Sequence, residues 1–130
     1  MSRKPAPPKP TESELSVLRV LWRRGPSTVR GVWEELNREH RTGYTTALKI
    51  MQIMIEKGLV KRDESQRSHV YQAACSREQT QRQVVGHVLD RLFAGSATQL
   101  VLQALSAKQA SRAELAEIRK LLDKMEGGAS

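Results

Sequence analysis

The 130-residue sequence is poor in cysteine and in aromatic residues. Cys75 is the one cysteine, so no disulfide can form within the chain, and this fits the reducing cytoplasm. Aromatic residues make up 4% of the sequence, so Leu, Val, Ile and Met must supply most of the core. No run reaches the roughly 18 apolar residues that indicate a membrane-spanning helix. We therefore expect a small cytoplasmic protein with no membrane insertion.

Residue patterns typical of catalysis or metal binding are also missing. His40, His69 and His87 lie far apart, and none has a partner at the spacing of a metal site. The sequence has no glycine-rich phosphate loop, no nucleophile elbow and no zinc-type cysteine pair. Cys75 with a distant histidine does not make a thiol nucleophile. We expect no enzymatic activity, no cofactor and no bound metal.

Acidic residues are too few to balance the basic ones. The chain has 22 Lys and Arg against 14 Asp and Glu, which gives a formal net charge of +8. Residues 1–72 hold fourteen basic and eight acidic side chains, so this part carries +6 of the total. Such an excess favours a polyanionic partner, nucleic acid before an anionic membrane surface.

Local start and stop signals predict three helices in the first half of the chain. Prolines and charges over residues 1–10 predict a disordered basic arm. The sequence Thr-Glu-Ser-Glu at residues 11–14 is a capping box that begins a helix, and Gly25 ends it. Ser27 can cap a second helix, and a third is predicted over residues 44–57, just before a glycine.

Two short β-prone runs follow these helices, at residues 59–63 and 69–72, with a polar segment between them. Three helices and a hairpin, in about sixty residues, are the elements of a winged helix-turn-helix in their usual order. We therefore expect a mainly α fold with a small β-hairpin, in which residues 11–75 form a winged-helix DNA-binding domain.

The C-terminal part is predicted to be helical and to dimerise. Capping boxes that begin at Ser76, Ser96 and Ser111 predict three helices over residues 76–126, before a flexible tail at 127–130. Three amphipathic helices can bury only part of their apolar faces within one chain, so we expect a homodimer. The alternative is a monomer in which they fold back onto the winged helix. The expected dimerisation residues are Val85, Leu89, Leu92, Phe93, Leu115, Ile118, Leu122 and Met125.

The helix predicted at residues 44–57 has one apolar and one polar face. At 100° per residue, Ala47, Met51 and Met54 fall together and point inward, flanked by Tyr44, Ile50 and Ile55. Hydroxyl, amide and ammonium groups on the other face suit base edges and phosphates, and an isoleucine suits a thymine methyl. Capping the helix is the alternative role for its two threonines. The residues expected in the major groove are Thr45, Thr46, Lys49, Gln52 and Ile53.

Basic residues on either side of this helix are further candidates for DNA contacts. Arg41 precedes the helix, and Arg67 lies at the tip of the predicted hairpin. Lys61 and Arg62 are neighbours in a strand and point to opposite faces, so they cannot both face the same surface. Acidic residues in the hairpin dilute its charge. A winged helix that binds another protein without specific DNA binding is therefore the alternative function.

Taken together, six short motifs resemble the BlaI/MecI/CopY family of penicillinase-type repressors. Their order and spacing carry the resemblance, which runs from Thr11 to about Met125. It implies a homodimer with an N-terminal winged helix and a C-terminal dimerisation region, a repressor that blocks transcription from a palindromic operator in double-stranded DNA. The family's recognition positions fall here on Thr45, Thr46 and Lys49. The motifs are Thr11-Glu-Ser-Glu-Leu15, Val20-Leu-Trp22, Ser27-Thr-Val29, Tyr44-Thr-Thr46, Glu56-Lys-Gly-Leu-Val60 and Ser68-His-Val-Tyr71.

The resemblance also implies an upstream sensor or protease as a partner. In the β-lactam branch of the family, derepression follows cleavage at an Asn-Phe bond. The corresponding stretch here ends in Gln103-Ala104 and lacks the aromatic residue, so the sequence leaves derepression by proteolysis open. The copper branch carries paired Cys-x-Cys motifs, which Cys75 alone cannot provide.

Overall fold

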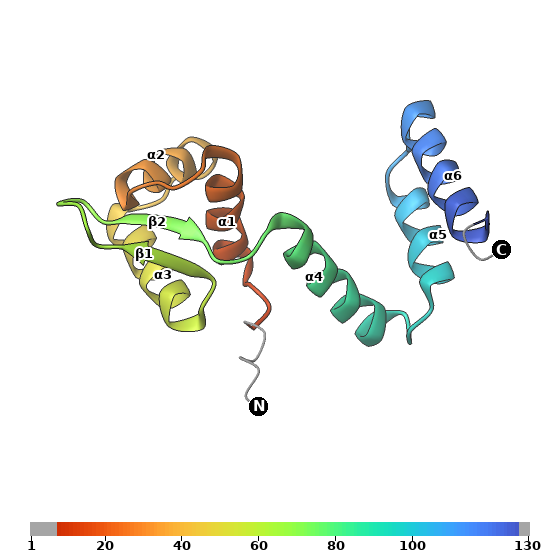
Figure 1. Ribbon diagram of the computed structural model, residues 1–130, viewed down its shortest axis with the longest axis horizontal. Helices are drawn as coiled ribbons and strands as arrows, with labels where there is room; N and C mark the ends of the chain where they lie inside the picture. Colours follow the sequence, from red (N-terminus) through yellow and green to blue (C-terminus); the bar gives the residue numbers. More distant parts are fainter. Residues whose placement is uncertain (1–7, 128–130) are drawn as a thin grey trace. The chain divides into compact units, whose positions relative to one another are not determined.

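The computed structural model describes residues 8–127, and its contacts divide the chain into two compact units, Met1–Val85 and Gly86–Ser130. The first unit contains three helices, a two-stranded hairpin and the start of a fourth helix (Figure 1). The predicted mainly helical fold with one hairpin is thereby confirmed. The predicted arm and tail fall mostly on residues 1–7 and 128–130, which lie outside the described residues.

Helix α1 (Glu12–Arg24) begins and ends at the predicted signals. The Thr11 hydroxyl accepts a hydrogen bond from the Glu14 amide at 3.2 Å, and the Glu14 carboxylate accepts one from the Thr11 amide at 2.9 Å. Gly25 ends the helix with a φ of 87°, a backbone conformation that other residues rarely adopt. The predicted capping box is confirmed.

Helix α2 (Val29–Glu39) begins one residue later than the Ser27 cap would place it. The hydroxyl that caps the helix belongs to Thr28, and it accepts a hydrogen bond from the Gly31 amide at 3.1 Å. Ser27 instead pairs with Tyr71 as an isolated β-bridge, with N–H···O distances of 2.9 and 2.7 Å. The prediction of Ser27 as the cap is wrong, because this residue's backbone is held in an extended pairing.

Helix α3 (Tyr44–Lys57) has the bounds that the sequence predicts and ends at a left-handed Gly58. The predicted hairpin, the wing of the fold, is also present. Its strands β1 (Val60–Asp63) and β2 (Val70–Ala73) pair antiparallel, with Val60 opposite Ala73 and Asp63 opposite Val70. Through the bridge to β2 described above, the turn before α2 is fastened to the wing.

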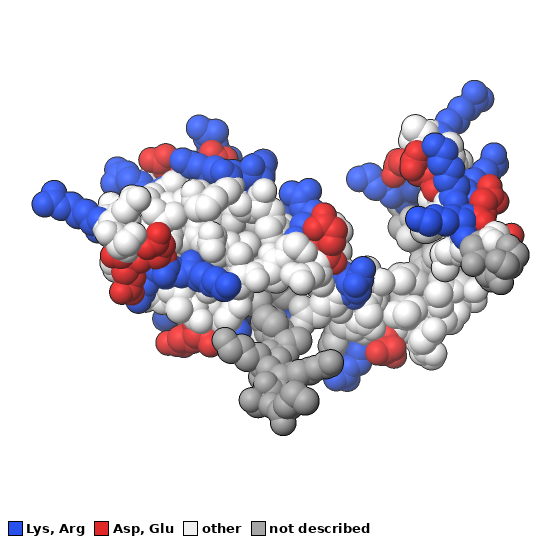
Figure 2. Space-filling model, viewed as in Figure 1, with Lys and Arg blue, Asp and Glu red and all other residues white. Residues whose placement is uncertain are grey.

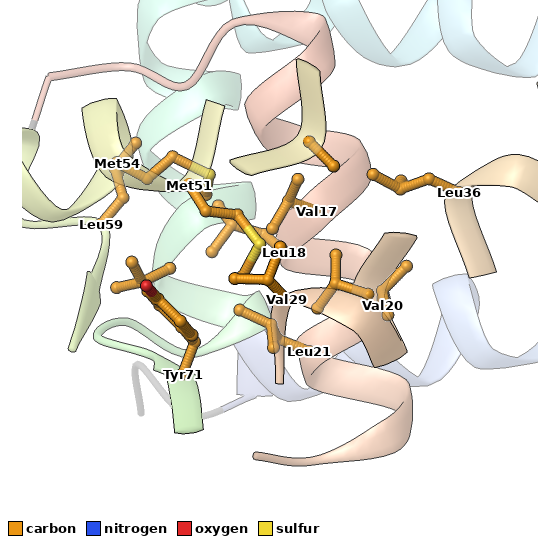
Figure 3. Close-up of a cluster of buried hydrophobic side chains, with 13 residues drawn as sticks. Val17, Leu18, Val20, Leu21, Val29, Leu36, Met51, Met54, Leu59 and Tyr71 are labelled. Carbon is orange, nitrogen blue, oxygen red and sulfur yellow. The ribbon is translucent and has the colours of Figure 1, made fainter. Parts of the chain in front are cut away.

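The core of the first unit lies where α1, α2, α3 and the hairpin meet. Figure 3 shows Leu18 of α1 and Met51 of α3 pointing toward one another at its centre, with Tyr71 of β2 beside them. Each fully buried aliphatic or Met side chain contributes about 1.5–3 kcal/mol. The buried hydrophobic residues are Val17, Leu18, Val20, Leu21, Val29, Val32, Leu36, Ala47, Met51, Met54, Leu59, Val60 and Tyr71.

Three helices follow the wing: α4 (Arg77–Leu92), α5 (Ala97–Ala107) and α6 (Arg112–Gly127). The capping boxes at Ser76 and Ser111 are confirmed by reciprocal side-chain to backbone hydrogen bonds. Phe93, one of the expected dimerisation residues, lies beyond the end of α4, in the turn that Gly95 completes with a φ of 81°. No residue of α5 or α6 is buried. Among residues 8–127, no helix is long and apolar enough to cross a membrane.

Candidate nucleic-acid interface

The outer face of α3 is polar and open to solvent. Residues that are four, seven or eight positions apart lie on one side of a helix. Lys49, Gln52 and Ile53 therefore lie on the same side of α3 as Thr45. Ile53 is 37% exposed and offers the one large apolar contact of this face. All five residues that the sequence places in the major groove are exposed: Thr45, Thr46, Lys49, Gln52 and Ile53.

The inner face of α3 holds the helix against the core. Ala47, Met51 and Met54 have no exposed surface, as their helical spacing predicts, and Ile50 and Ile55 are half-buried. Tyr44 differs from the prediction: it is 44% exposed because it lies in the first turn, at the rim of the core.

A hydrogen-bonded clamp fixes the loop that leads into α3. The indole N–H of Trp33 donates to the carbonyl oxygen of Thr42 at 2.7 Å, and the Asn37 side chain accepts from the Thr42 amide at 3.0 Å. The ring of Trp33 also meets the ring of Tyr44 edge-on, with centroids 5.9 Å apart. Helix α2 therefore sets both the position of the loop and the start of α3.

The N-terminus of α3 has no side-chain cap. Gly43 is the capping residue, and neither Thr45 nor Thr46 closes the first turn, so the capping role considered for the two threonines is not the one they have. The first amides of a helix and its dipole favour an anion. Beside this end lies a hollow of about 270 Å³, whose wall includes Arg41 and Thr46. A phosphate group fits the chemistry of this end of the helix.

The two basic residues of β1 have different surroundings. Arg62 pairs with Glu64, and hydrogen bonding to Tyr71, reinforced by the Glu64 charge, raises the pKa of Arg62. Lys61 lies opposite Gln72 in the strand register, and its side chain is exposed. Of the two, Lys61 is the cation left open to a partner.

Ion pairs separate the remaining basic residues into two groups. Glu35 of α2 lies 3.2 Å from Arg23 and 3.4 Å from Arg38, so these two charges are already balanced in part. Figure 2 shows Lys and Arg side chains over α2 and at the end of the wing, with acidic side chains among them. Within the described part of the chain, four of the five basic residues predicted to contact DNA form no ion pair: Arg41, Lys49, Lys61 and Arg67.

One buried ion pair ties α1 to the far end of α3. The Lys57 ammonium lies 2.7 Å from the Glu14 carboxylate, which is 5% exposed. Burial raises the pKa of Glu14, but the hydrogen bonds from Lys57 and Thr11 outweigh it, so the pKa lies below its ordinary value. Glu14 is therefore ionised at neutral pH and holds α3 at its C-terminal end.

Comparison with known proteins identifies the family of the chain. The sequence model of the penicillinase repressor family matches residues 10–124. The chain belongs to the penicillinase repressor family. This is a family of transcriptional regulators, a class that is not enzymatic, and among the described residues no group of three His, Cys, Asp or Glu is placed to hold a metal ion.

Solved structures similar to this family member share its fold. The solution structure of the DNA-binding domain of the repressor BlaI is 22% identical, with a TM-score of 0.50 over 55% of this chain and 88% of that domain. Monomeric BlaI of Bacillus licheniformis in complex with the blaP half-operator is also 22% identical, with a TM-score of 0.50 over 56% and 89%. No curated protein matches the chain. The likeness establishes a winged-helix fold.

The sequence did not indicate the residues that position the candidate interface of this family member. Trp33 lies on an apolar stripe, so its ring is expected in the core, but the partner of its indole N–H is a loop carbonyl nine residues away. The sequence shows Lys57 only as a basic residue in the last turn of a helix. Its ion pair with Glu14 could not be predicted, because the two residues are 43 positions apart. A buried carboxylate in a capping box is the one hint that a cation is needed nearby.

Proposed function

We propose that the chain is a dimeric transcriptional repressor that places the outer face of α3 in the major groove of a palindromic operator. The single observation that carries this proposal is the exposed polar face of α3 on a winged-helix core, in a chain of the penicillinase repressor family. Monomeric BlaI of Bacillus licheniformis, which shares the fold, was solved in complex with the blaP half-operator, and this supports DNA binding.

The chemistry of the face assigns a role to each side chain. Lys49 reaches a guanine edge or a phosphate, Gln52 reads an adenine edge, and Ile53 contacts a thymine methyl. Thr45 and Thr46 lie in the first turn, where the amides and the helix dipole favour a phosphate. Arg41 before α3 and the wing residues Lys61 and Arg67 contact the DNA backbone on either side.

Dimerisation is the second part of the proposal, and the apolar surface of the C-terminal helices supports it. Large apolar side chains on α6 are left in water, with Leu122 52% and Met125 67% exposed. A soluble chain gains free energy when a second copy covers such a face. Of the eight predicted dimerisation residues, five are exposed and three, Leu89, Phe93 and Ile118, are half-buried within one copy.

A dimer also binds an operator more tightly than a single chain does. A single small module buries about 600–1,000 Å² on DNA, which supports only modest specific binding. Two modules joined by their C-terminal helices read half-sites about one helical turn apart, and the second contact then becomes intramolecular. Bound over a promoter, such a dimer excludes polymerase by occupying its site.

The test is a titration of operator and random duplex DNA with the full chain over a range of salt concentrations. We expect tighter binding to the operator, identified by genome-wide footprinting. We also expect Lys49→Ala to weaken specific binding and to reduce the salt slope by about one. The matched control is Lys108→Ala, which removes an exposed lysine in the second unit.

Two outcomes contradict the proposal. If the chain ignores duplex DNA at low ionic strength, the winged helix serves a protein partner instead. If Lys49→Ala and Lys108→Ala bind the operator as well as the unaltered chain does, the face of α3 is not the one that enters the groove.

A further inference from the structure

A groove of about 500 Å³ lies between α1 and the first turns of α4, away from the DNA-binding face of α3. All of its lining residues belong to the first unit. Its volume is in the range of pockets that bind small molecules, about 300–1,000 Å³. The residues that line it are Leu15, Arg19, Trp22, Arg23, Arg77, Thr80, Gln81, Val84 and Val85.

The floor of the groove is apolar and is held in place by hydrogen bonds. The indole N–H of Trp22 donates to the carbonyl oxygen of Cys75 at 2.9 Å, which fixes the ring against the segment that leads into α4. Thr80 is buried, and its hydroxyl lies 3.2 Å from the Cys75 sulfur. Trp22 and Val84 are half-buried and leave apolar surface open toward the groove.

The rim of the groove is positively charged. Arg77 places its guanidinium 5.8 Å from the centre of the Trp22 ring, and Arg19 donates a hydrogen bond to the Ser16 hydroxyl. Arg23 forms an ion pair with Glu35 of α2. No Asp or Glu is among the residues that line the groove. Guanidinium groups bind carboxylates through paired, charge-assisted hydrogen bonds, so the rim is complementary to a carboxylate.

We propose that this groove binds a small amphipathic carboxylate, whose apolar body lies on Trp22 and Val84 and whose carboxylate meets Arg77 and Arg19. Neither feature alone selects this ligand. An apolar floor would accept any hydrophobic group, and a basic rim would accept any anion; together they require both parts in one molecule.

The position of the groove gives such a ligand a route to regulation, and this part rests on the proposed function. Helix α4 is continuous from Arg77 to Leu92 and so runs across the boundary after Val85. A ligand between α1 and α4 biases the direction in which α4 leaves the first unit. In a dimer joined through its C-terminal helices, that direction sets the spacing of the two α3 helices and hence the affinity for the operator.

The binding test uses the full chain, without DNA, and follows the indole N–H signals by nuclear magnetic resonance. The probe is 4-phenylbutyrate, and the control ligand is its neutral amide, 4-phenylbutyramide. We expect the Trp22 signal, assigned with Trp33→Phe, to shift in a saturable way with the acid, while the Trp33 signal in the unaltered chain stays in place. Arg77→Gln should weaken binding of the acid by about tenfold, since charge-assisted hydrogen bonds are lost. Arg82→Gln, exposed on the same helix but outside the groove, should leave binding unchanged.

Three results would overturn the proposal: no saturable shift of Trp22 at millimolar probe, an equal response to the acid and the amide, or equal binding by Arg77→Gln. The first is also the result expected if a second copy of the chain covers the groove. An operator titration with and without 4-phenylbutyrate then tests regulation, with Arg77→Gln as the unresponsive variant. If the chain bound no DNA, that titration would fail while the shift of Trp22 remained, so the two failures are distinguishable.

Discussion

Glu14 takes part in two structures at once, the capping box of α1 and the ion pair with Lys57 at the end of α3. Its carboxylate is nearly buried, so its charge is tolerated only because the Thr11 amide and the Lys57 ammonium donate hydrogen bonds to it. A residue that the local sequence identifies as part of a capping box also makes, in the folded chain, a tertiary contact that holds α3.

The lowered pKa of Glu14 predicts a pH dependence of stability. The folded chain binds this proton more weakly than the unfolded chain, so the contribution of Glu14 is complete above the ordinary pKa of 4.5 and is lost as the pH falls through the lower folded value. Glu14→Gln should cost about 1.5–3 kcal/mol in the free energy of unfolding at pH 7. Urea unfolding at pH 7 and at pH 3 measures the cost of the substitution and its dependence on pH.

The control is Glu12→Gln, in the same turn of α1 but exposed. It should cost less than about 1 kcal/mol, through the helix dipole alone. Two results would show that the ion pair with Lys57 does not stabilise the fold. One is an equal loss in the free energy of unfolding of the two variants at pH 7. The other is a difference between the variants that is as large at pH 3 as at pH 7.

Among the elements, α3 depends most on its neighbours. The buried residues of its inner face are Ala47, Met51 and Met54. The ion pair described above ties its last turn to α1, and its first turn follows the loop that Trp33 holds. The wing is fastened by the pairing of Tyr71 with the turn before α2. The candidate interface is therefore preorganised by contacts that lie behind it.

The clamp can be tested because the chain contains two tryptophans, each with one indole hydrogen bond to a carbonyl. Trp33→Phe and Trp22→Phe each remove such a bond, and each should cost about 1 kcal/mol of stability. Only Trp33→Phe should lower operator affinity, because the loop that carries Arg41 loses its anchor. Unfolding curves and operator titrations of both variants provide the measurement, and an equal drop in affinity would rule out a specific role for the clamp.

For the whole molecule, the main contrast is between a well-buried first unit and C-terminal helices with no buried residues in α5 or α6. The first unit has a core of its own. Most of the large apolar side chains of α5 and α6 remain exposed in a single copy, and this is the physical reason to expect that the functional molecule contains two chains.

Leu122→Asp tests that expectation by placing a charge in the proposed seam of α6. Burying an unpaired carboxylate is costly, so sedimentation should show a monomer, and operator affinity should fall by about a hundredfold or more through lost avidity. Ala116→Asp adds the same charge on the other side of the helix and should remain a dimer. A Leu122→Asp variant that stays a tight dimer would place the interface elsewhere.

The sequence by itself determined the features that depend on neighbours along the chain. The bounds of α3, its glycine end and the capping box of α1 follow from interactions within four residues, and the polar face of α3 follows from the helical period. The family resemblance is of the same kind, since it depends on the order of short motifs.

Only the tertiary structure decided which of several chemically suitable groups is used. Thr28 caps α2 because Ser27 pairs with Tyr71, 44 positions away, and Arg62 rather than Lys61 is held in the wing because Tyr71 lies opposite Arg62. The groove between α1 and α4 likewise brings together residues about 60 positions apart. Local patterns carry no record of such partners, because a side chain's propensities are the same whether or not a distant segment folds against it.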